Sequence, residues 1–242
     1  AKYAFIEQMK NIKIYIFSLI VLSSFSYIVL ANQVNQENSS NLSVEADTSL
    51  EWFEKEKYYL AKGNVILKKD GLTLKANIVR ANYNVENGEN VLKNLIAKEN
   101  VILTKAKSKA TGQYMTYDVA KKVAIISGSY QTFSSPSGYV ESKKVIMFDD
   151  LKNKAEANGD VKIILSNKNV IYADNVKADF NAKDKSLQKA TAKGNVIIEN
   201  RQKGKKSKAD KGIYNSLDEI IRLSGNVTII NNNSVINGSK GI

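Results

Sequence analysis

A short motif that recurs along the chain limits the possible folds more than any other feature of the sequence. The stretch LAKGNVIL at residues 60–67 returns in close variants at 96–103, 156–163, 191–198 and 222–229. Aligned on the centre of this motif, the chain contains six copies, spaced by 36, 29, 31, 35 and 31 residues, whose anchors are Gly63, Glu99, Gly128, Gly159, Gly194 and Gly225. A unit of about 32 residues cannot bury an apolar face alone, so the repeat predicts a stack of similar layers.

Apolar residues alternate with polar ones on both sides of each anchor. The positions two and four residues before and after Gly63 are apolar, and the other copies repeat this spacing. Because successive side chains of a strand point to opposite faces, each copy predicts one long strand with an apolar inner face. Glycine at the centre of this face favours a bulge or bend, so we expect each strand to turn a corner at its anchor. In the third copy this spacing places Tyr130 and Thr132 inside, and Thr132 is the single polar residue in the pattern.

A second motif, an aromatic residue followed by Asn or Asp, lies between successive anchors. Aromatic side chains suit a half-buried strand, and Asn or Asp begins a turn through hydrogen bonds of its own side chain. Each copy therefore predicts two strands and two turns. No segment of helical length shows a helical spacing of apolar residues, so we predict an all-β protein built from stacked antiparallel layers. The aromatic residues of this motif are Tyr83, Tyr117, Phe148, Phe180 and Tyr214.

The absence of Cys and His excludes several kinds of site. The 242 residues include neither amino acid, which rules out disulfides, thiol nucleophiles, Ser-His catalytic pairs and metal sites ligated by Cys or His. Asp and Glu are scattered mainly over predicted turns and outward positions, whereas a carboxylate enzyme needs convergent acids. We therefore predict no catalytic residue, no metal site and no cofactor.

The first 31 residues differ from the rest of the chain. Lys10 and Lys13 precede an apolar run over residues 14–30, and Val29 and Ala31 form a small-residue cleavage pattern. We expect residues 1–31 to contain eight upstream residues and then a secretory signal peptide that begins at Met9 and is cleaved after Ala31. Such a signal implies export to the periplasm and argues against nucleic acid as a partner. An uncleaved inner-membrane anchor is the alternative, because about 17 apolar residues reach the lower limit for spanning a bilayer.

The remaining boundaries follow from the repeat. Residues 32–41 are polar and without periodicity, so we expect a flexible leader before a β domain over residues 42–242. The segment GSKGI at 238–242 aligns with ADKGI at 209–213, where an aromatic residue follows. We therefore expect the sixth copy to continue beyond Ile242.

The residues from 42 to 84 carry a resemblance to a known family. EAD at 45–47 is followed by the GNV strand at 63–65 and by a strand over 76–83, and similar segments return later as YADNVKADFN and KADKGIYN. This pattern resembles the LptA/OstA family of periplasmic lipopolysaccharide-transport proteins, over residues 42–242. The resemblance implies an elongated, twisted, open β-jellyroll whose apolar groove holds the acyl chains of lipopolysaccharide. It also implies a bridge between inner-membrane and outer-membrane transport proteins of the same fold, without catalytic residues.

The inner-face positions are the candidate lipid contacts under this resemblance. Each buried methylene contributes roughly 0.8 kcal/mol, so an apolar groove would shield lipid chains from water. The same rows also fit a closed protein core, and periodicity alone does not distinguish the two. The candidate groove residues are Val65, Leu67, Leu95, Val101, Leu103, Met115, Tyr117, Ile126, Ile146, Phe148, Val161, Ile163, Phe180, Val196, Ile198, Tyr214, Leu223, Val227 and Ile229.

Basic residues form two clusters. The net charge is +12, and removing residues 1–31, which contain three Lys and one Glu, leaves +10. A positive groove edge would attract lipid phosphates, whereas the alternative is that these lysines belong to solvated turns. The candidate phosphate contacts are Lys105, Lys107, Lys109, Lys205 and Lys206.

The last predicted strand has an unprotected edge. The segment NVTIINNNSVI at residues 226–236 carries neither charge nor proline, the usual devices that block pairing with another chain. We expect head-to-tail association with itself or with partners of the same fold through strand addition. Two other functions fit the same sequence: an anchored inner-membrane member of the same pathway, and a secreted β-solenoid adhesin or carbohydrate-active protein.

Overall fold

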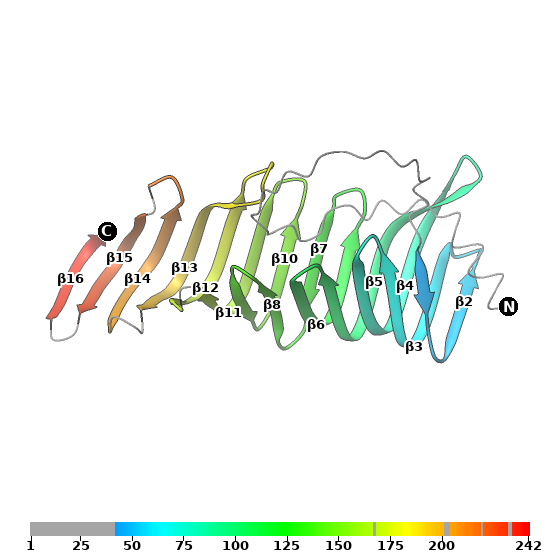
Figure 1. Cartoon of the computed structure of the whole chain (residues 1–242), viewed down its shortest axis with the longest axis horizontal. Coiled ribbons are helices and arrows are strands. Elements are labelled where there is room, and N and C mark those ends of the chain that lie inside the picture. The colour runs from blue at the N-terminus through cyan, green and yellow to red at the C-terminus, as the bar shows by residue number, and fades with distance from the viewer. Residues whose placement is uncertain (1–41, 167, 201–203, 219, 232–233) are drawn as a thin grey trace, which may run out of the picture.

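The computed structural model describes residues 42–166, 168–200, 204–218, 220–231 and 234–242. The expected signal peptide and leader over residues 1–41 lie outside these residues. The described chain is an elongated all-β molecule whose strands succeed one another along its long axis (Figure 1). Its sixteen strands form one antiparallel sheet, as the repeat predicted. None of the described residues belongs to a helix with the length and apolar character needed to cross a membrane.

Every pair of hydrogen-bonded strands is antiparallel, and the longest strands belong to the repeated units. Their bounds are β1 (Ser43–Glu45), β2 (Ser49–Phe53), β3 (Tyr58–Lys69), β4 (Leu72–Glu86), β5 (Glu89–Lys105), β6 (Ser108–Asp118), β7 (Val123–Ser127), β8 (Gln131–Ser135), β9 (Gly138–Ser142), β10 (Val145–Asp149), β11 (Lys154–Leu165), β12 (Val170–Phe180), β13 (Leu187–Asn200), β14 (Lys205–Asn215), β15 (Ile220–Asn231) and β16 (Ser234–Gly241).

Most neighbours in the sheet are consecutive strands joined by hairpins. The order is β1-β3-β4-β5-β6-β7-β10-β11-β12-β13-β14-β15-β16. At the N-terminal end, β1 and β2 pair with different parts of β3. In the middle, β8 pairs with β6 and β9, and β9 also pairs with β11. Each layer therefore hydrogen-bonds to the next layer along the molecule.

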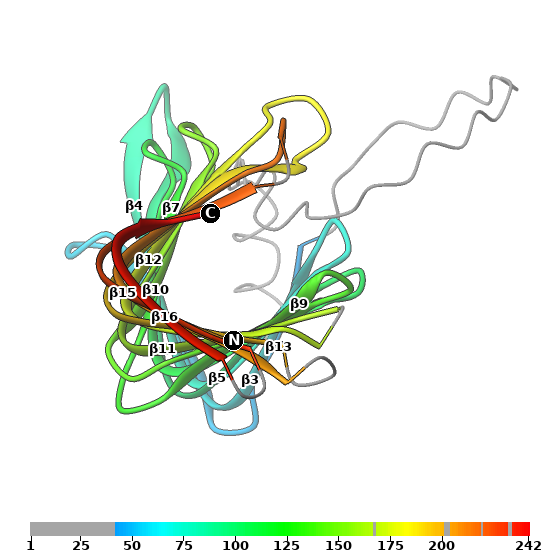
Figure 2. The ribbon, with the colours of Figure 1, turned by 90° about the vertical axis from the view of Figure 1, so that its left-hand side faces the viewer.

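Each long strand turns a corner at its anchor, as the sequence predicted. The pairing of β3 with β4 skips from Lys62 to Val65, which leaves Gly63 and Asn64 out of register as a bulge. Their φ angles are +81° and +41°, a conformation that glycine and asparagine tolerate better than most residues. Because of such bulges the strands curl around the long axis (Figure 2). The same shift occurs at residues 99–100, 159–160, 194–195 and 225–226.

A side-chain bridge to the neighbouring strand holds the corner. Asn195 Nδ2 donates to Asp174 Oδ2 over 3.0 Å, and equivalent asparagine–aspartate bridges of 2.9 Å hold the first and last corners. Gly194 lies against the same carboxylate, so that a Cβ at this position would fall 2.8 Å from Asp174 Cγ. The corner therefore requires glycine both for its φ of +74° and for the lack of space.

The third copy departs from the prediction. Here the strand breaks, because β7 ends just before Gly128 and β8 starts at Gln131. Tyr130, predicted on the inner face, is 48% exposed, whereas Gln131 and Phe133 are 0% and 5% exposed. The prediction for Tyr130 and Thr132 is wrong because this corner contains one more residue than the others, and a shift of one residue exchanges the two faces of a strand.

The turns that follow the aromatic motif agree with the prediction in four of five cases. Asp118 Oδ1 accepts a hydrogen bond of 3.0 Å from the backbone N–H of Lys121, and the next three motifs make comparable bonds of 2.8–3.0 Å. The first motif is the exception, because β4 continues past Asn84 to Glu86. Residues 87–88, Asn-Gly with φ of +51° and +80°, form a two-residue hairpin turn. The β4–β5 hairpin therefore projects beyond its neighbours near the N-terminal end (Figure 1).

Candidate functional site

The nineteen predicted groove residues lie in the apolar interior of the curled sheet or at its margin, and none of them is exposed. Six are half-buried, namely Phe148, Ile163, Phe180, Ile198, Tyr214 and Ile229. Thirteen are buried, namely Val65, Leu67, Leu95, Val101, Leu103, Met115, Tyr117, Ile126, Ile146, Val161, Val196, Leu223 and Val227. Both a lipid groove and a closed core would bury these positions, so burial alone does not distinguish the two.

The interior becomes more accessible from β3 towards β16. In the row of side chains four residues after each anchor, or five in the third copy, the first three are 3–5% exposed, whereas the next three are half-buried. Ile236 on β16 pairs opposite the last residue of this row and is 64% exposed. At this row the interior is therefore closed in its first half and more accessible to solvent in its second half, whereas Val161, Val196 and Val227 beside the corners remain 1–3% exposed. The row consists of Leu67, Leu103, Phe133, Ile163, Ile198 and Ile229.

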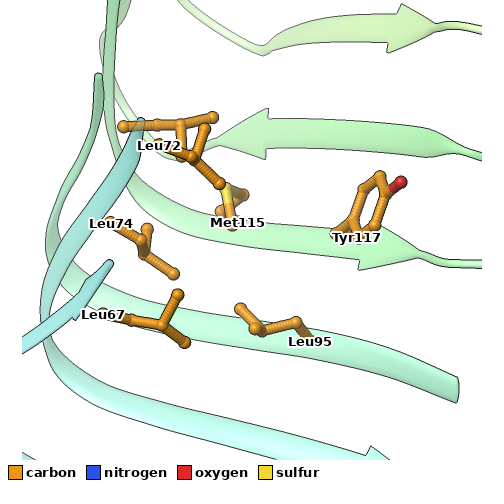
Figure 3. A pocket seen from close by; sticks show the side chains of 7 residues that line it. Leu67, Leu72, Leu74, Leu95, Met115 and Tyr117 are labelled. Atoms are coloured by element: carbon orange, nitrogen blue, oxygen red, sulfur yellow. The ribbon is translucent and has the colours of Figure 1, made fainter. Parts of the chain in front are cut away.

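The closed half contains a small apolar cavity between β3, β4, β5 and β6 (Figure 3). Its volume is about 20 Å³, room for about one water molecule. An acyl chain can enter it only if the surrounding strands move apart. Leu72 and Leu74 are not among the predicted site residues, although buried and less buried residues alternate at the start of β4 as they do in the other strands. The lining residues are Leu67, Leu72, Leu74, Leu95, Leu103, Met115 and Tyr117.

Two buried polar side chains in the interior have atoms without a hydrogen-bond partner among the described residues. Gln131 is 0% exposed, and neither its Oε1 nor its Nε2 atom has a partner. The Tyr117 hydroxyl is also unpaired, and its oxygen points away from the leucine side chains of the cavity (Figure 3). Burial raises the pKa of Tyr117, and the negative charges of Asp150 and Asp118 raise it further. Gln131 is absent from the predicted site residues because the spacing of the other copies places Tyr130 and Thr132 on the inner face instead.

The turns at one end of the strands form a rim that we call the lysine rim. Hairpins of an antiparallel sheet reverse at alternate ends, so the β3–β4, β5–β6, β11–β12 and β13–β14 turns lie on the same rim. Among the predicted phosphate contacts, Lys206 is the one that pairs within 4 Å with a described carboxylate, Glu199 at 2.9 Å. All five of these contacts lie beside turns of this rim, namely Lys105, Lys107, Lys109, Lys205 and Lys206.

On the opposite rim, two lysines are paired with acids of their own turns. Lys121 lies 3.4 Å from Asp118, and Lys152 lies 3.0 Å from Asp149. Both lysines are exposed, so the pairs are screened by solvent, but they offset the negative charge of Asp118 and Asp149. These two turns are therefore less attractive to an anionic ligand than the unpaired lysines of the lysine rim.

A second hollow, of about 470 Å³, lies at the corner of β11, β12 and β13. Its lining includes Asp160, Asp174 and Glu199. These acids already have partners: Asp174 bridges the corner, Asp160 pairs with Lys143 at 2.9 Å, and Glu199 pairs with Lys206. Among the described residues, no group of three or more acids could hold a metal ion. Because its acids already have partners, we interpret this hollow as part of the corner and not as a binding site.

Aromatic side chains pack at the N-terminal end of the interior. The Trp52 ring stacks on Tyr59 with centroids 6.1 Å apart, and its Nε1 donates to the Tyr83 hydroxyl over 2.8 Å. Phe53 stacks on Tyr58 at 4.4 Å, and this second pair lies on the opposite face of the sheet because Tyr58 alternates with the buried Tyr59. The contacts of Tyr59 with Trp52 and Tyr83 therefore join β2, β3 and β4 in the first layer of the sheet.

The comparison with protein-family models identifies the family of the chain. The family model described as "LptA/(LptD N-terminal domain) LPS transport protein" matches the chain twice, over residues 43–150 and 139–241. Among solved structures, LptH of Pseudomonas aeruginosa, described as the LptA homologous periplasmic component of the lipopolysaccharide transport device, is similar at 12% identity and a TM-score of 0.25. That similarity covers 79% of this chain and 94% of LptH. No curated protein matches the chain. Because the two family matches span nearly all of the described sheet, the chain belongs to the LptA/(LptD N-terminal domain) family of lipopolysaccharide transport proteins.

Proposed function

We propose that this lipopolysaccharide transport protein works in the periplasm, where it shields the acyl chains of lipopolysaccharide and passes the lipid between inner-membrane and outer-membrane partners. The observation that carries the proposal is the apolar interior, which runs through successive layers and opens to solvent towards β16. An acyl chain of about twelve methylenes would gain roughly 10 kcal/mol from burial on such a surface. Family membership supports the choice of lipid.

The lysine rim supplies the contacts for the charged part of the lipid in this proposal. Lys107, Lys109 and Lys205 are exposed, and none of them has an ion-pair partner among the described carboxylates. A phosphate held at the rim would leave the acyl chains free to lie along the interior. Such contacts weaken as salt increases, because exposed charges are screened.

Strand addition at the ends would join the protein to its partners. β15 pairs on both sides, with β14 and β16, so the C-terminal edge of the described sheet is β16 rather than β15. Val235 and Ile236 on β16 are 60% and 64% exposed. We propose that β16 pairs with the N-terminal edge strand of another molecule of the same fold, which continues the interior across the joint.

The proposed location depends on the fate of the N-terminal segment. A periplasmic protein released from its signal peptide would begin at Asn32. Recovery of the same chain in membranes with Met9 still present would instead support an anchored member of the same pathway. We propose no catalytic activity, because the family is one of transport proteins.

Mass spectrometry of the exported protein tests the proposal most simply. Gentle purification from cells that make lipopolysaccharide should recover a near-stoichiometric complex with this lipid. A matched sample carrying Ile163→Asp and Ile198→Asp, which introduces two charges into the open half of the interior, should recover much less lipid. Equal recovery from both samples would contradict binding in the interior.

A further inference from the structure

One polar pair interrupts the apolar row that follows the corners. In the third copy the row contains Gln131, which pairs opposite Ser142 on β9. Both residues lie in strands near the middle of the long axis (Figure 1). In the other five copies the row contains valine opposite alanine or glycine, in the pairs Val65 with Ala76, Val101 with Gly112, Val161 with Ala173, Val196 with Ala209 and Val227 with Gly238.

The two members of this pair differ in their hydrogen bonding. Ser142 is 0% exposed, but its hydroxyl lies within hydrogen-bonding distance of the carbonyl oxygens of Val145, at 3.1 Å, and Asn158. Gln131 is equally buried, yet both polar atoms of its amide lack a partner among the described residues. Buried amides are almost always bonded, since an unpaired one destabilises the folded state. The amide of Gln131 is thus a polar group for which the closed interior supplies no partner.

The surroundings of Gln131 place its amide in the interior rather than in a turn. A Cβ on Gly112 of β6 would lie 3.5 Å from Gln131 Cγ and 2.5 Å from Ile126 Cγ2. Gln131 therefore extends over the space that the glycine leaves open. Ile126 comes from β7, on the other side of the corner from β8. A lipid chain that lies along the interior would pass this position.

We propose that Gln131 is a specificity-determining residue that hydrogen-bonds to the polar linkage of an acylated lipid in the opened interior. The side-chain amide offers one acceptor and two donor hydrogens. It can donate from Nε2 to an amide or ester carbonyl, and accept at Oε1 from an amide N–H or a hydroxyl. Acyl chains joined through amide and ester bonds, as in lipopolysaccharide, carry these groups, whereas alkyl ether chains lack carbonyls and donors. This inference rests on the proposed function.

The test compares the mature full chain with Gln131→Met, which keeps the length of the side chain and removes the amide. Titration with lipopolysaccharide should give a Kd about five- to tenfold higher for the variant, the effect of one or two lost hydrogen bonds. Titration with a dialkyl-ether phosphatidylglycerol should give the same Kd for both proteins. In the absence of lipid, the Tm of the variant should rise by about 2 °C or more, because no bond is lost and an unpaired amide is removed.

Gln188→Met is the matched control, because Gln188 is an exposed glutamine on β13. It should change neither the affinities nor the Tm. If the native chain binds lipopolysaccharide and Gln131→Met binds it equally well, the role of Gln131 is refuted while the proposed function stands. If the native chain binds neither lipid, the proposed function fails and the role of Gln131 with it. A lower Tm for Gln131→Met would show that the amide has a partner in the lipid-free protein and would also overturn the inference.

A second measurement decides the question if the methionine variant does not fold. In the native chain, the side-chain ¹⁵N–¹H₂ signals of Gln131 should shift on addition of lipopolysaccharide and stay unchanged with the ether lipid. Unchanged signals with a bound lipopolysaccharide would refute the contact.

Discussion

Substituting Gly194 by alanine tests how the corners are built. The glycine has a φ of +74°, and a new Cβ would fall 2.8 Å from Asp174 Cγ. The left-handed conformation costs a non-glycine residue about 1–2 kcal/mol. Displacing the carboxylate also disrupts the bridge to Asn195, a hydrogen bond that contributes about 0.5–1.5 kcal/mol. We therefore expect Gly194→Ala to lower the free energy of unfolding by about 2–3 kcal/mol.

Gly88→Ala separates the two contributions. Gly88 has a similar φ of +80°, but a Cβ there meets no atom within 4 Å. Its replacement should therefore show the backbone cost alone, about 1–2 kcal/mol. For a domain of this size each kcal/mol lowers the Tm by about 2–4 °C, so thermal unfolding should distinguish the two variants. In the background of Asp174→Ala, the cost of Gly194→Ala should fall towards that of Gly88→Ala.

The outcome that would refute this reasoning is equal destabilisation by Gly194→Ala and Gly88→Ala, with no dependence on Asp174. The carboxylate would then play no part in the corner, and the glycine would be required only for its backbone conformation.

Three further predictions concern the interior, the rim and the edge. Tyr117→Phe removes an unpaired hydroxyl, so stability at neutral pH should stay the same or rise by about 1 kcal/mol. Because the pKa of Tyr117 is raised above 10.0, the contribution of the protonated hydroxyl to the free energy of unfolding is complete below pH 10 and is lost as the pH rises towards the folded-state pKa. In equilibrium unfolding, the stability of Tyr117→Phe should therefore fall less steeply at alkaline pH than that of the native chain. Changing Lys105, Lys107 and Lys109 together to Gln should weaken lipopolysaccharide binding and the dependence of that binding on salt. Lys121→Gln with Lys152→Gln, two paired lysines on the opposite rim, should have little effect in the same titration. Val235→Lys with Ile236→Lys should abolish concentration-dependent assembly in light scattering, while Val85→Lys, a 51% exposed position on the β4–β5 hairpin, should not; assembly unaffected by the edge change would exclude β16 as the joint.

The parts of the fold that local chemistry determines could be predicted from the sequence. The Gly-Asn and Gly-Asp pairs identify the corners because few residues accept two successive positive φ angles, as Gly63 and Asn64 do. The turns after Asp118 and its equivalents follow from side chains that bond their own backbone. The all-β layers and the family resemblance rest on these same repeated positions.

The remaining differences depend on contacts between distant parts of the chain. One extra residue after Gly128 moves Gln131 and Phe133 inside, which a fixed spacing cannot reveal. The anchors and the aromatic motif also do not mark the first half of the second strand of each unit, where Leu74 and Val170 are buried. The closure of the interior around Leu103 and its opening around Ile198 depend on how far the two arms of the curled strands approach each other, a property of the assembled sheet.

Site-specific photocrosslinking during transport tests the central claim most directly. A photoreactive residue at Ile163 or Ile198, in the open half of the interior, should capture lipopolysaccharide strongly, and one at Leu103, in the closed half, should capture it only as the interior opens. The same residue at Lys62 or Thr228, whose side chains alternate to the opposite face, should capture little. Equal capture from both faces, or none from Ile163 and Ile198, would contradict the account of an interior that shields lipid chains.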